Sequence, residues 1–221
     1  MCSAYKKICE EISDTAVKCG RNPKEISLVA VTKGMSWEEA SFFYDQGQRD
    51  FGENRVAEAL DKKLIAPADC RWHFIGNLQK NKVRKVVGNF ALIHSVDSFE
   101  LAEKLSTVSL EMNIRTPILL QVNISGEISK QGYTPEEWRS CIEKVMQLPG
   151  ITVEGLMTMA PLTEDEEQVR KCFRGLRLFG EDLRKISGCP LPHLSMGMSH
   201  DFKIAIEEGA TLLRIGNALR I

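Results

Sequence analysis

The amino-acid sequence predicts an α/β fold, a single (β/α)8 TIM barrel with one extra helix at the N-terminus. Eight short apolar runs of strand length alternate with longer segments that have helical spacing. Several runs, such as SLVAV, PILLQV and TLLRI, are apolar on both faces, which is typical of parallel strands covered on both sides. The length of 221 residues, 43% of them hydrophobic, suits one barrel, so we expect a single domain over residues 1–221.

The predicted strands lie, in chain order, at residues 26–32, 49–52, 72–76, 91–95, 117–123, 151–157, 191–196 and 211–216. A doubly wound open sheet is the alternative fold. The absence of a G-x-G-x-x-G motif after the first strand argues against it. Periodicity alone leaves this alternative open, because the second and third strands are short.

Local signals mark where the predicted helices begin and end. Three pairs have capping-box spacing, in which a hydroxyl and a Glu three residues later each accept a backbone N–H at the helix start. These pairs are Ser36 with Glu39, Thr134 with Glu137, and Thr163 with Glu166. Glycine readily adopts the left-handed conformation that ends a helix. Such glycines follow four helical segments, at Gly20, Gly47, Gly88 and Gly209.

Composition limits the kinds of partner. Lys and Arg number 29 against 30 Asp and Glu, so the net charge of −1 creates no overall field for nucleic acid or an anionic membrane. The first residues, MCSAYKKICEEISDTAVKCG, are charged throughout and predict neither a signal peptide nor a membrane span. Seven scattered cysteines without a C-x-x-C pair favour a reducing cytoplasm and argue against a metal site.

In a (β/α)8 barrel the residues at the carboxyl ends of the strands meet at one rim, where the active site forms. Here these positions hold Lys33, Asn54, Asn123 and Met157, followed by the segments SMGMS (residues 195–199) and RIGN (residues 214–217). His73 and His94 lie within short strands, where a buried histidine with satisfied hydrogen bonds is commoner than a catalytic base. The candidate site therefore lies among the strand ends.

The segments after the seventh and eighth strands favour a phosphate site. Ser195 and Ser199 carry hydroxyls, and Gly197 lets the backbone approach a ligand closely. A helix predicted to start at about Ser199 would direct free N–H groups at an anion, and Gly216 and Asn217 add amides. Ordinary turn chemistry is the alternative interpretation, since Gly and Ser are common in turns.

Two basic residues allow two interpretations each. A partly desolvated Lys33 could attack a carbonyl as a neutral amine, or its stem could pack along the barrel mouth while its head reaches water. Arg214 lies inside an apolar strand and needs a partner. That partner is either a carboxylate, with Glu154 as the candidate, or the ring nitrogen of a bound cofactor.

Eight motifs, in order over nearly the whole chain, resemble the pyridoxal phosphate homeostasis protein family: AVTKG, FGENRV, WHFIGNLQKNK, HSVDS, QVNIS, EGLMTM, LSMGMSHD and LLRIGNAL. The resemblance implies a barrel of the alanine racemase N-terminal domain type that binds pyridoxal 5′-phosphate (PLP) as an internal aldimine on Lys33. It further implies that Arg214 faces the pyridine nitrogen and that Asn54 and Asn123 line the ring side. The phosphate would be held by Ser195, Met196, Gly197, Ser199, Gly216 and Asn217. Met157 completes the candidate cofactor-binding residues.

The family resemblance implies a role in intracellular PLP homeostasis with little or no catalytic turnover. Expected partners are PLP and PLP-dependent apoenzymes, with no nucleic acid or membrane, and the chain is expected to be a monomer. Two alternatives remain: an amino-acid racemase-like enzyme with weak activity, and a class-I-aldolase-like barrel that uses Lys33 on a sugar phosphate. A weak electron sink, which an unprotonated pyridine would be, argues against efficient racemisation.

Overall fold

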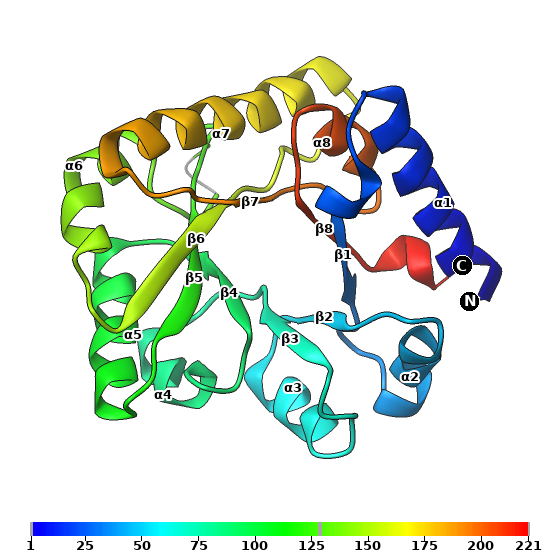
Figure 1. Cartoon of the computed structure of the whole chain (residues 1–221), viewed down its shortest axis with the longest axis horizontal. Coiled ribbons are helices and arrows are strands. Elements are labelled where there is room, and N and C mark those ends of the chain that lie inside the picture. Colours follow the sequence, from blue (N-terminus) through cyan, green and yellow to red (C-terminus); the bar gives the residue numbers. More distant parts are fainter. Residues whose placement is uncertain (1, 128–129, 221) are drawn as a thin grey trace.

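A computed structural model describes residues 2–127 and 130–220, and its strands form a closed parallel barrel (Figure 1). The strands follow one another around the ring in chain order, and the first pairs with the last. They are β1 (Ser27–Val31), β2 (Asp50–Glu53), β3 (Arg71–Phe74), β4 (Leu92–Val96), β5 (Thr116–Gln121), β6 (Ile151–Met157), β7 (His193–Ser195) and β8 (Leu212–Ile215). The barrel prediction is confirmed, and closure excludes the open sheet. The ends of the predicted domain, Met1 and Ile221, lie outside the described residues.

Helices surround the barrel on the outside (Figure 1). The α-helices are α1 (Cys2–Lys18), α2 (Trp37–Asp45), α3 (Val56–Lys63), α4 (Val83–Val86), α5 (Phe99–Glu111), α6 (Pro135–Met146), α7 (Glu166–Ser187) and α8 (Phe202–Glu207). Short 3-10 turns occur at η1 (Pro23–Glu25), η2 (Lys80–Lys82) and η3 (Asn217–Leu219). The extra helix α1 packs against α8 and η3, so the two ends of the chain lie side by side.

Two of the three predicted helix starts are correct. Ser36 and Thr134 both form complete capping boxes at the starts of α2 and α6. The prediction for Thr163 is wrong, because α7 begins at Glu166 and its N-cap is Asp165. The Asp165 carboxylate accepts hydrogen bonds from two backbone N–H groups of the first turn, at 3.0 and 3.3 Å. An Asp caps as well as a Thr does, so the later residue takes the position.

The apolar residues form two separate clusters because strand side chains alternate between the two faces. The large cluster lies between the strands and the helices and includes Leu213 and Ile215 of β8. A small cluster contains the strand residues that point the opposite way, into the barrel: Leu92, Leu119, Met157 and Leu212. Leu212 and Arg214 are two positions apart on β8 and so share the inner face. The barrel interior therefore holds apolar side chains as well as the polar Arg214.

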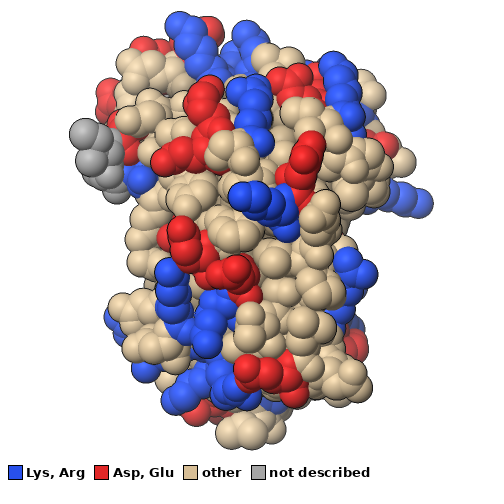
Figure 2. Space-filling model, turned by 90° about the vertical axis from the view of Figure 1, so that its left-hand side faces the viewer, with Lys and Arg blue, Asp and Glu red and all other residues tan. Residues whose placement is uncertain are grey.

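The surface carries both signs of charge. Figure 2 shows Lys and Arg interspersed with Asp and Glu, so the described part of this face presents no broad patch of one sign. Within residues 2–127 and 130–220, none of the helices combines the length and apolar character needed to cross a membrane.

A cluster of charged and polar side chains lies at the end of the barrel where the strands begin. The Arg71 guanidinium donates two hydrogen bonds to the Asp50 carboxylate, at 2.6 and 2.5 Å, and Asp50 Oδ1 lies 3.0 Å from His73 Nε2. Burial would raise the pKa of the Asp50 carboxyl, but the hydrogen bonds from Arg71 and His73 outweigh it and lower the pKa to about 2. Asp50 is therefore a carboxylate throughout the physiological pH range.

We expect Asp50→Asn to remove a pH-dependent part of the stability. The ordinary Asp pKa of 3.8 falls to about 2 on folding, so the carboxylate stabilises the fold by about 2 kcal/mol above pH 4. This contribution should disappear as the pH falls from about 4 through 2. Urea unfolding of the parent protein and Asp50→Asn between about pH 2.5 and pH 7 measures this contribution as the difference between their free energies of unfolding. A difference that does not change with pH would contradict the assignment.

Candidate functional site

A cavity of about 320 Å³ opens at the carboxyl ends of the strands. Six of the residues predicted from the sequence line it: Lys33, Asn54, Ser199, Arg214, Gly216 and Asn217. The remaining lining residues are Val31, Ile75, Gly76, Met159, Met198 and His200. The wall is thus built from segments that follow several different strands, as expected for an active site on this fold.

Lys33 comes two residues after the end of β1 and lines the cavity with an exposed side chain. The following residue, Gly34, has φ +69°, a left-handed conformation that turns the chain away towards α2. On the other side, the carbonyl of Lys33 accepts a hydrogen bond from Arg220 Nη2, near the end of the chain. Lys33 is therefore held by its backbone, while its amine remains accessible from the cavity.

A buried ion pair lies directly beneath Lys33. Lys62 of α3 donates to Glu53 Oε1 at 2.5 Å and to the carbonyl of Thr32 at 2.7 Å. The Thr32 hydroxyl donates to the same carboxylate oxygen at 2.6 Å. The side chains of Lys62 and Glu53 are only 7% and 0% exposed. Since Thr32 precedes Lys33 and Glu53 precedes Asn54, this ion pair fixes the two strand ends that carry cavity residues.

The connections after β7 and β8 meet at the cavity. Ser199 Oγ accepts a hydrogen bond from Ala218 N at 3.2 Å, and Arg214 N donates to the Gly197 carbonyl at 3.0 Å. Gly197 has φ +92°, and a Cβ there would lie 2.6 Å from the Ala205 Cβ, so this position requires glycine. The two segments predicted to share an anion are therefore adjacent.

The helix expected at about Ser199 begins later than predicted. The chain forms a turn from Ser199 to Asp201, and α8 starts at Phe202. The Asp201 carboxylate accepts a hydrogen bond from Met198 N at 2.5 Å, and Phe202 N donates to the Met198 carbonyl at 3.0 Å. These local bonds hold the turn and delay the helix, so the prediction of its start at Ser199 is wrong.

Arg214 is 5% exposed and has protein partners on both terminal nitrogens. Nη1 donates to Ser195 Oγ at 2.5 Å, and Nη2 donates to the Thr158 carbonyl at 2.9 Å. Burial lowers the pKa of Arg214 to about 10, so the guanidinium stays protonated at neutral pH. The prediction that Glu154 pairs with Arg214 is wrong. The Glu154 carboxylate lies at the other end of the barrel, 3.9 Å from His193 Nε2.

Among the described residues, five predicted ones do not line this cavity. Asn123 shapes its own loop, since its side chain donates to the Glu127 carbonyl and accepts from Gly126 N, both at 3.0 Å. Met157 belongs to the small apolar cluster inside the barrel. The other three, Ser195, Met196 and Gly197, are buried behind the wall. Ser195 contacts the site only through Arg214.

Several lining residues were missed by sequence reasoning. Gly76 follows β3, and a Cβ there would lie 2.1 Å from the carbonyl oxygen of Asn54, so only glycine lets the two segments approach. Ser95 Oγ donates to the Gly76 carbonyl at 2.5 Å and holds it in place. Ile75 and Gly76 are the last two residues of the predicted third strand, in the motif WHFIG, and could have been found by including both among the strand-end candidates.

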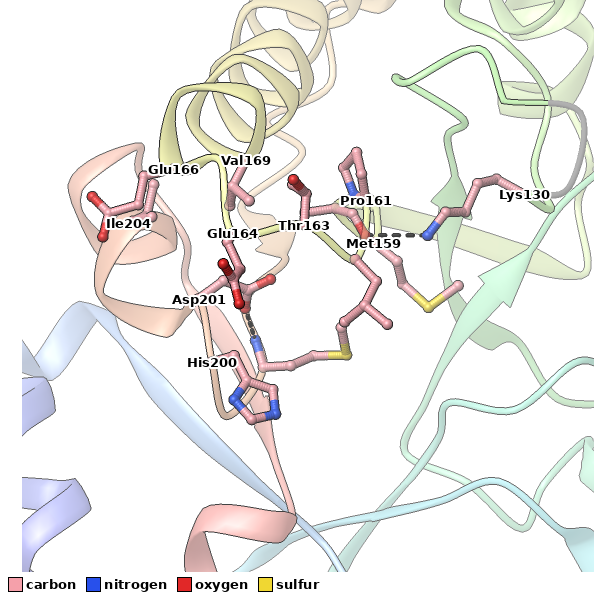
Figure 3. A pocket seen from close by; sticks show the side chains of 13 residues that line it. Lys130, Met159, Pro161, Thr163, Glu164, Glu166, Val169, His200, Asp201 and Ile204 are labelled. Carbon is pink, nitrogen blue, oxygen red and sulfur yellow. Dashed lines mark hydrogen bonds between the residues drawn. The ribbon is translucent and has the colours of Figure 1, made fainter.

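A larger cavity of about 590 Å³ adjoins the first and shares Met159, Met198 and His200 with it. In Figure 3, Lys130 reaches in from the connection after β5, and His200 and Asp201 come from the connection after β7. Lys130 Nζ donates to the Ala160 carbonyl at 3.2 Å. The neighbouring cavity thus gives the candidate site room for a ligand that extends beyond it.

Known proteins resemble the chain along almost its whole length. The family model described as alanine racemase, N-terminal domain, matches residues 21–220. A pyridoxal phosphate homeostasis protein of Aquifex aeolicus (strain VF5) is 41% identical over 99% of this chain and 96% of its own length. A protein of the same name from Pseudomonas aeruginosa is 39% identical over 96% of this chain and 91% of its own length.

A solved structure of a related protein has the same fold as this chain. PipY of Synechococcus elongatus PCC7942, with PLP bound, superposes with a TM-score of 0.85 and is 37% identical. The match covers 94% of this chain and 99% of PipY. The chain therefore belongs to the pyridoxal phosphate homeostasis protein family, with a barrel of the alanine racemase N-terminal domain type.

Proposed function

We propose that this protein binds PLP in the 320 Å³ cavity and acts in intracellular PLP homeostasis, with the cofactor joined covalently to Lys33. The observation that carries the proposal is the meeting of three features in one cavity: the Lys33 amine, the Arg214 guanidinium and the joined connections after β7 and β8. The PLP-bound state of PipY, a relative of similar length, supports the same ligand class.

The residues present fit this ligand. The cavity volume falls at the lower end of the range of about 300–1,000 Å³ typical of small-molecule sites. Ser199, Gly216 and Asn217 offer a hydroxyl and amides to a phosphate group. Arg214 has five N–H groups and donates two of them to Ser195 and Thr158, so a remaining N–H group can donate to a ring nitrogen. Because Arg214 remains protonated, it would keep that nitrogen unprotonated.

Lys33 supplies the covalent step. Lys33 would hold PLP through a C=N bond between its amine nitrogen and the aldehyde carbon, with the aldehyde oxygen lost as water. Bound PLP would supply an electron sink, which is weak while the ring nitrogen is unprotonated. The exposed position of Lys33 leaves its amine accessible to an aldehyde that enters the cavity.

We propose binding rather than efficient turnover. A racemase needs a base on each face of the cofactor. The three tyrosines hydrogen-bond elsewhere, to Gln48, Asp69 and Glu100, and none of them lines the described cavity. His200 lines the cavity and is the residue that could support weak racemase-like activity.

The proposal extends to compartment and partners. Six cysteines are free thiols, which supports a reducing cytoplasm: Cys9, Cys19, Cys70, Cys141, Cys172 and Cys189. We take residues 1–221 as one PLP-binding domain that works as a monomer and passes PLP to PLP-dependent apoenzymes. The face drawn in Figure 2 carries mixed charge and, in its described part, no broad basic patch that would favour nucleic acid or an anionic membrane.

An absorption spectrum of the purified protein with PLP tests this function. We expect a visible band from the C=N bond that sodium borohydride bleaches, with the reduced label on Lys33 in peptide mapping. Exchange of an amino acid α-proton in deuterated water would instead support the racemase alternative. Colourless protein that is trapped by dihydroxyacetone phosphate would overturn the proposal in favour of an aldolase-like enzyme.

A further inference from the structure

An unbroken line of hydrogen bonds runs through the barrel interior from one end to the cavity. Asp50 Oδ1 lies 3.0 Å from His73 Nε2, and His73 Nδ1 lies 2.9 Å from His94 Nε2. His94 Nδ1 lies 2.8 Å from Ser195 Oγ, which is 2.5 Å from Arg214 Nη1. The function proposed above assigns no role to His73, His94 or Ser195.

With His73 and His94 both neutral, the two ends of this line determine where every proton lies. A guanidinium can only donate, so Ser195 Oγ accepts from Arg214 and its own proton is free for His94 Nδ1. A carboxylate can only accept, so His73 Nε2 carries the proton that faces Asp50. With both rings neutral, His94 Nε2–H must donate to His73 Nδ1. All four donors then point away from the cavity, and both imidazoles are Nε2–H tautomers.

Burial and charge both favour this neutral arrangement. His94 and Ser195 are 0% exposed and His73 is 5% exposed. Burial above all, together with the nearby Arg214 charge, holds the pKa of His94 well below its ordinary value. Asp201 is the charged group that faces Arg214. A proton added to His94 would leave a buried cation beside Arg214, so His94 is neutral at neutral pH.

We propose that His73, His94 and Ser195 are positioning residues that aim the Arg214 guanidinium at the ring of the bound cofactor. The ligand in this inference rests on the proposed function, whereas the proton arrangement does not. Ser195 and the Thr158 carbonyl each hold one terminal nitrogen, which fixes the plane of the guanidinium. His94 keeps the Ser195 hydroxyl turned so that its lone pairs face Arg214. Without this line, only the Thr158 carbonyl would hold the Arg214 guanidinium.

The first test uses PLP-free protein. Nitrogen-15 NMR of histidine-labelled protein at pH 7 should show His73 and His94 as neutral rings protonated at Nε2, with the two signals assigned through His73→Asn and His94→Asn. A His94 ring protonated at Nδ1, or either ring charged on both nitrogens, would overturn the proposal. This result does not depend on whether the protein binds PLP.

The second test measures whether Ser195 acts through Arg214. Ser195→Ala should weaken PLP affinity by roughly 10-fold, the usual effect of losing a hydrogen bond to a charged group. In an Arg214→Met background, the same change should have no further effect on the Kd. Ser109→Ala is the matched control, because it also removes a buried hydroxyl, which is hydrogen-bonded to Thr116 of β5 at 2.7 Å. This variant should leave the Kd for PLP unchanged.

Equal losses from Ser195→Ala in both backgrounds would overturn the positioning role. If the parent protein does not bind PLP at all, the proposed function fails, while the NMR result still decides the proton arrangement. If Ser195→Ala does not fold, Ser195→Thr keeps the hydroxyl and should restore both folding and the coupling with Arg214. Folding of Ser195→Thr without that coupling would count against the proposal.

Discussion

Lys33→Ala should abolish the borohydride-sensitive visible band and weaken PLP binding by roughly 10- to 100-fold. The variant removes the amine that attacks the aldehyde but leaves Ser199, Gly216 and Asn217 to hold the phosphate. Residual binding should therefore be reversible, and borohydride should leave no covalent label on residue 33. Absorption spectra with and without borohydride, together with a PLP titration followed by fluorescence, measure both effects.

Lys130→Ala is the control for this experiment. Lys130 lines the adjoining cavity and is the other lysine near the site, but its amine donates to the Ala160 carbonyl. Removing it should leave the visible band and the labelled peptide at Lys33 unchanged. If Lys33→Ala stays as yellow and as borohydride-sensitive as the parent, or if the label moves to Lys130 in the parent protein, the assignment of Lys33 is wrong.

Lys62→Met should destabilise the protein by about 3–5 kcal/mol, which corresponds to a fall in Tm of roughly 10 °C for a chain of this size. The substitution keeps the length of the side chain but leaves the Glu53 carboxylate buried and without its cation. The second oxygen of this carboxylate, Oε2, is already buried and has no hydrogen-bond partner among the described residues. Removing the ammonium therefore isolates a charge that water cannot reach.

Two further variants separate the ion pair from general effects of the substitution. Lys63→Met changes the neighbouring exposed lysine, which donates to the Asn89 carbonyl, and should cost about 0.5 kcal/mol or less. The double variant Glu53→Gln with Lys62→Met removes both charges and should recover much of the loss. Thermal unfolding of all four proteins compares them directly. A Lys62→Met protein as stable as Lys63→Met would show that the buried pair contributes little.

The rim of the barrel could be predicted from the sequence because strand ends are local features. Lys33, Asn54, Arg214, Gly216 and Asn217 each follow or end a recognisable strand, and closure of the ring brings them to one cavity. The sequence also shows which residues there are glycines, but it does not show why glycine is required at those positions. Gly76 is required by its approach to Asn54, a contact between two different strand connections.

The same reasoning placed other residues incorrectly or incompletely. Asn123 follows a strand as Asn54 does, yet its side chain closes its own loop on Glu127 and Gly126. Met157 ends the longest strand but faces the apolar layer inside the barrel. Both positions satisfy the rule about strand ends, and only the direction of the side chain separates them from the cavity residues.

The order of strands and helices, the place of Lys33 at the end of the first strand and the family were determined by the sequence alone, since they depend on local period and on motifs. The partners of Arg214 were decided by the tertiary structure, which pairs it with Ser195 and Thr158 rather than Glu154. The line from Asp50 through His73 and His94 has the same origin. The physical reason is that residues far apart in the chain meet inside a closed barrel according to strand register and inward direction, and neither is encoded in the local pattern.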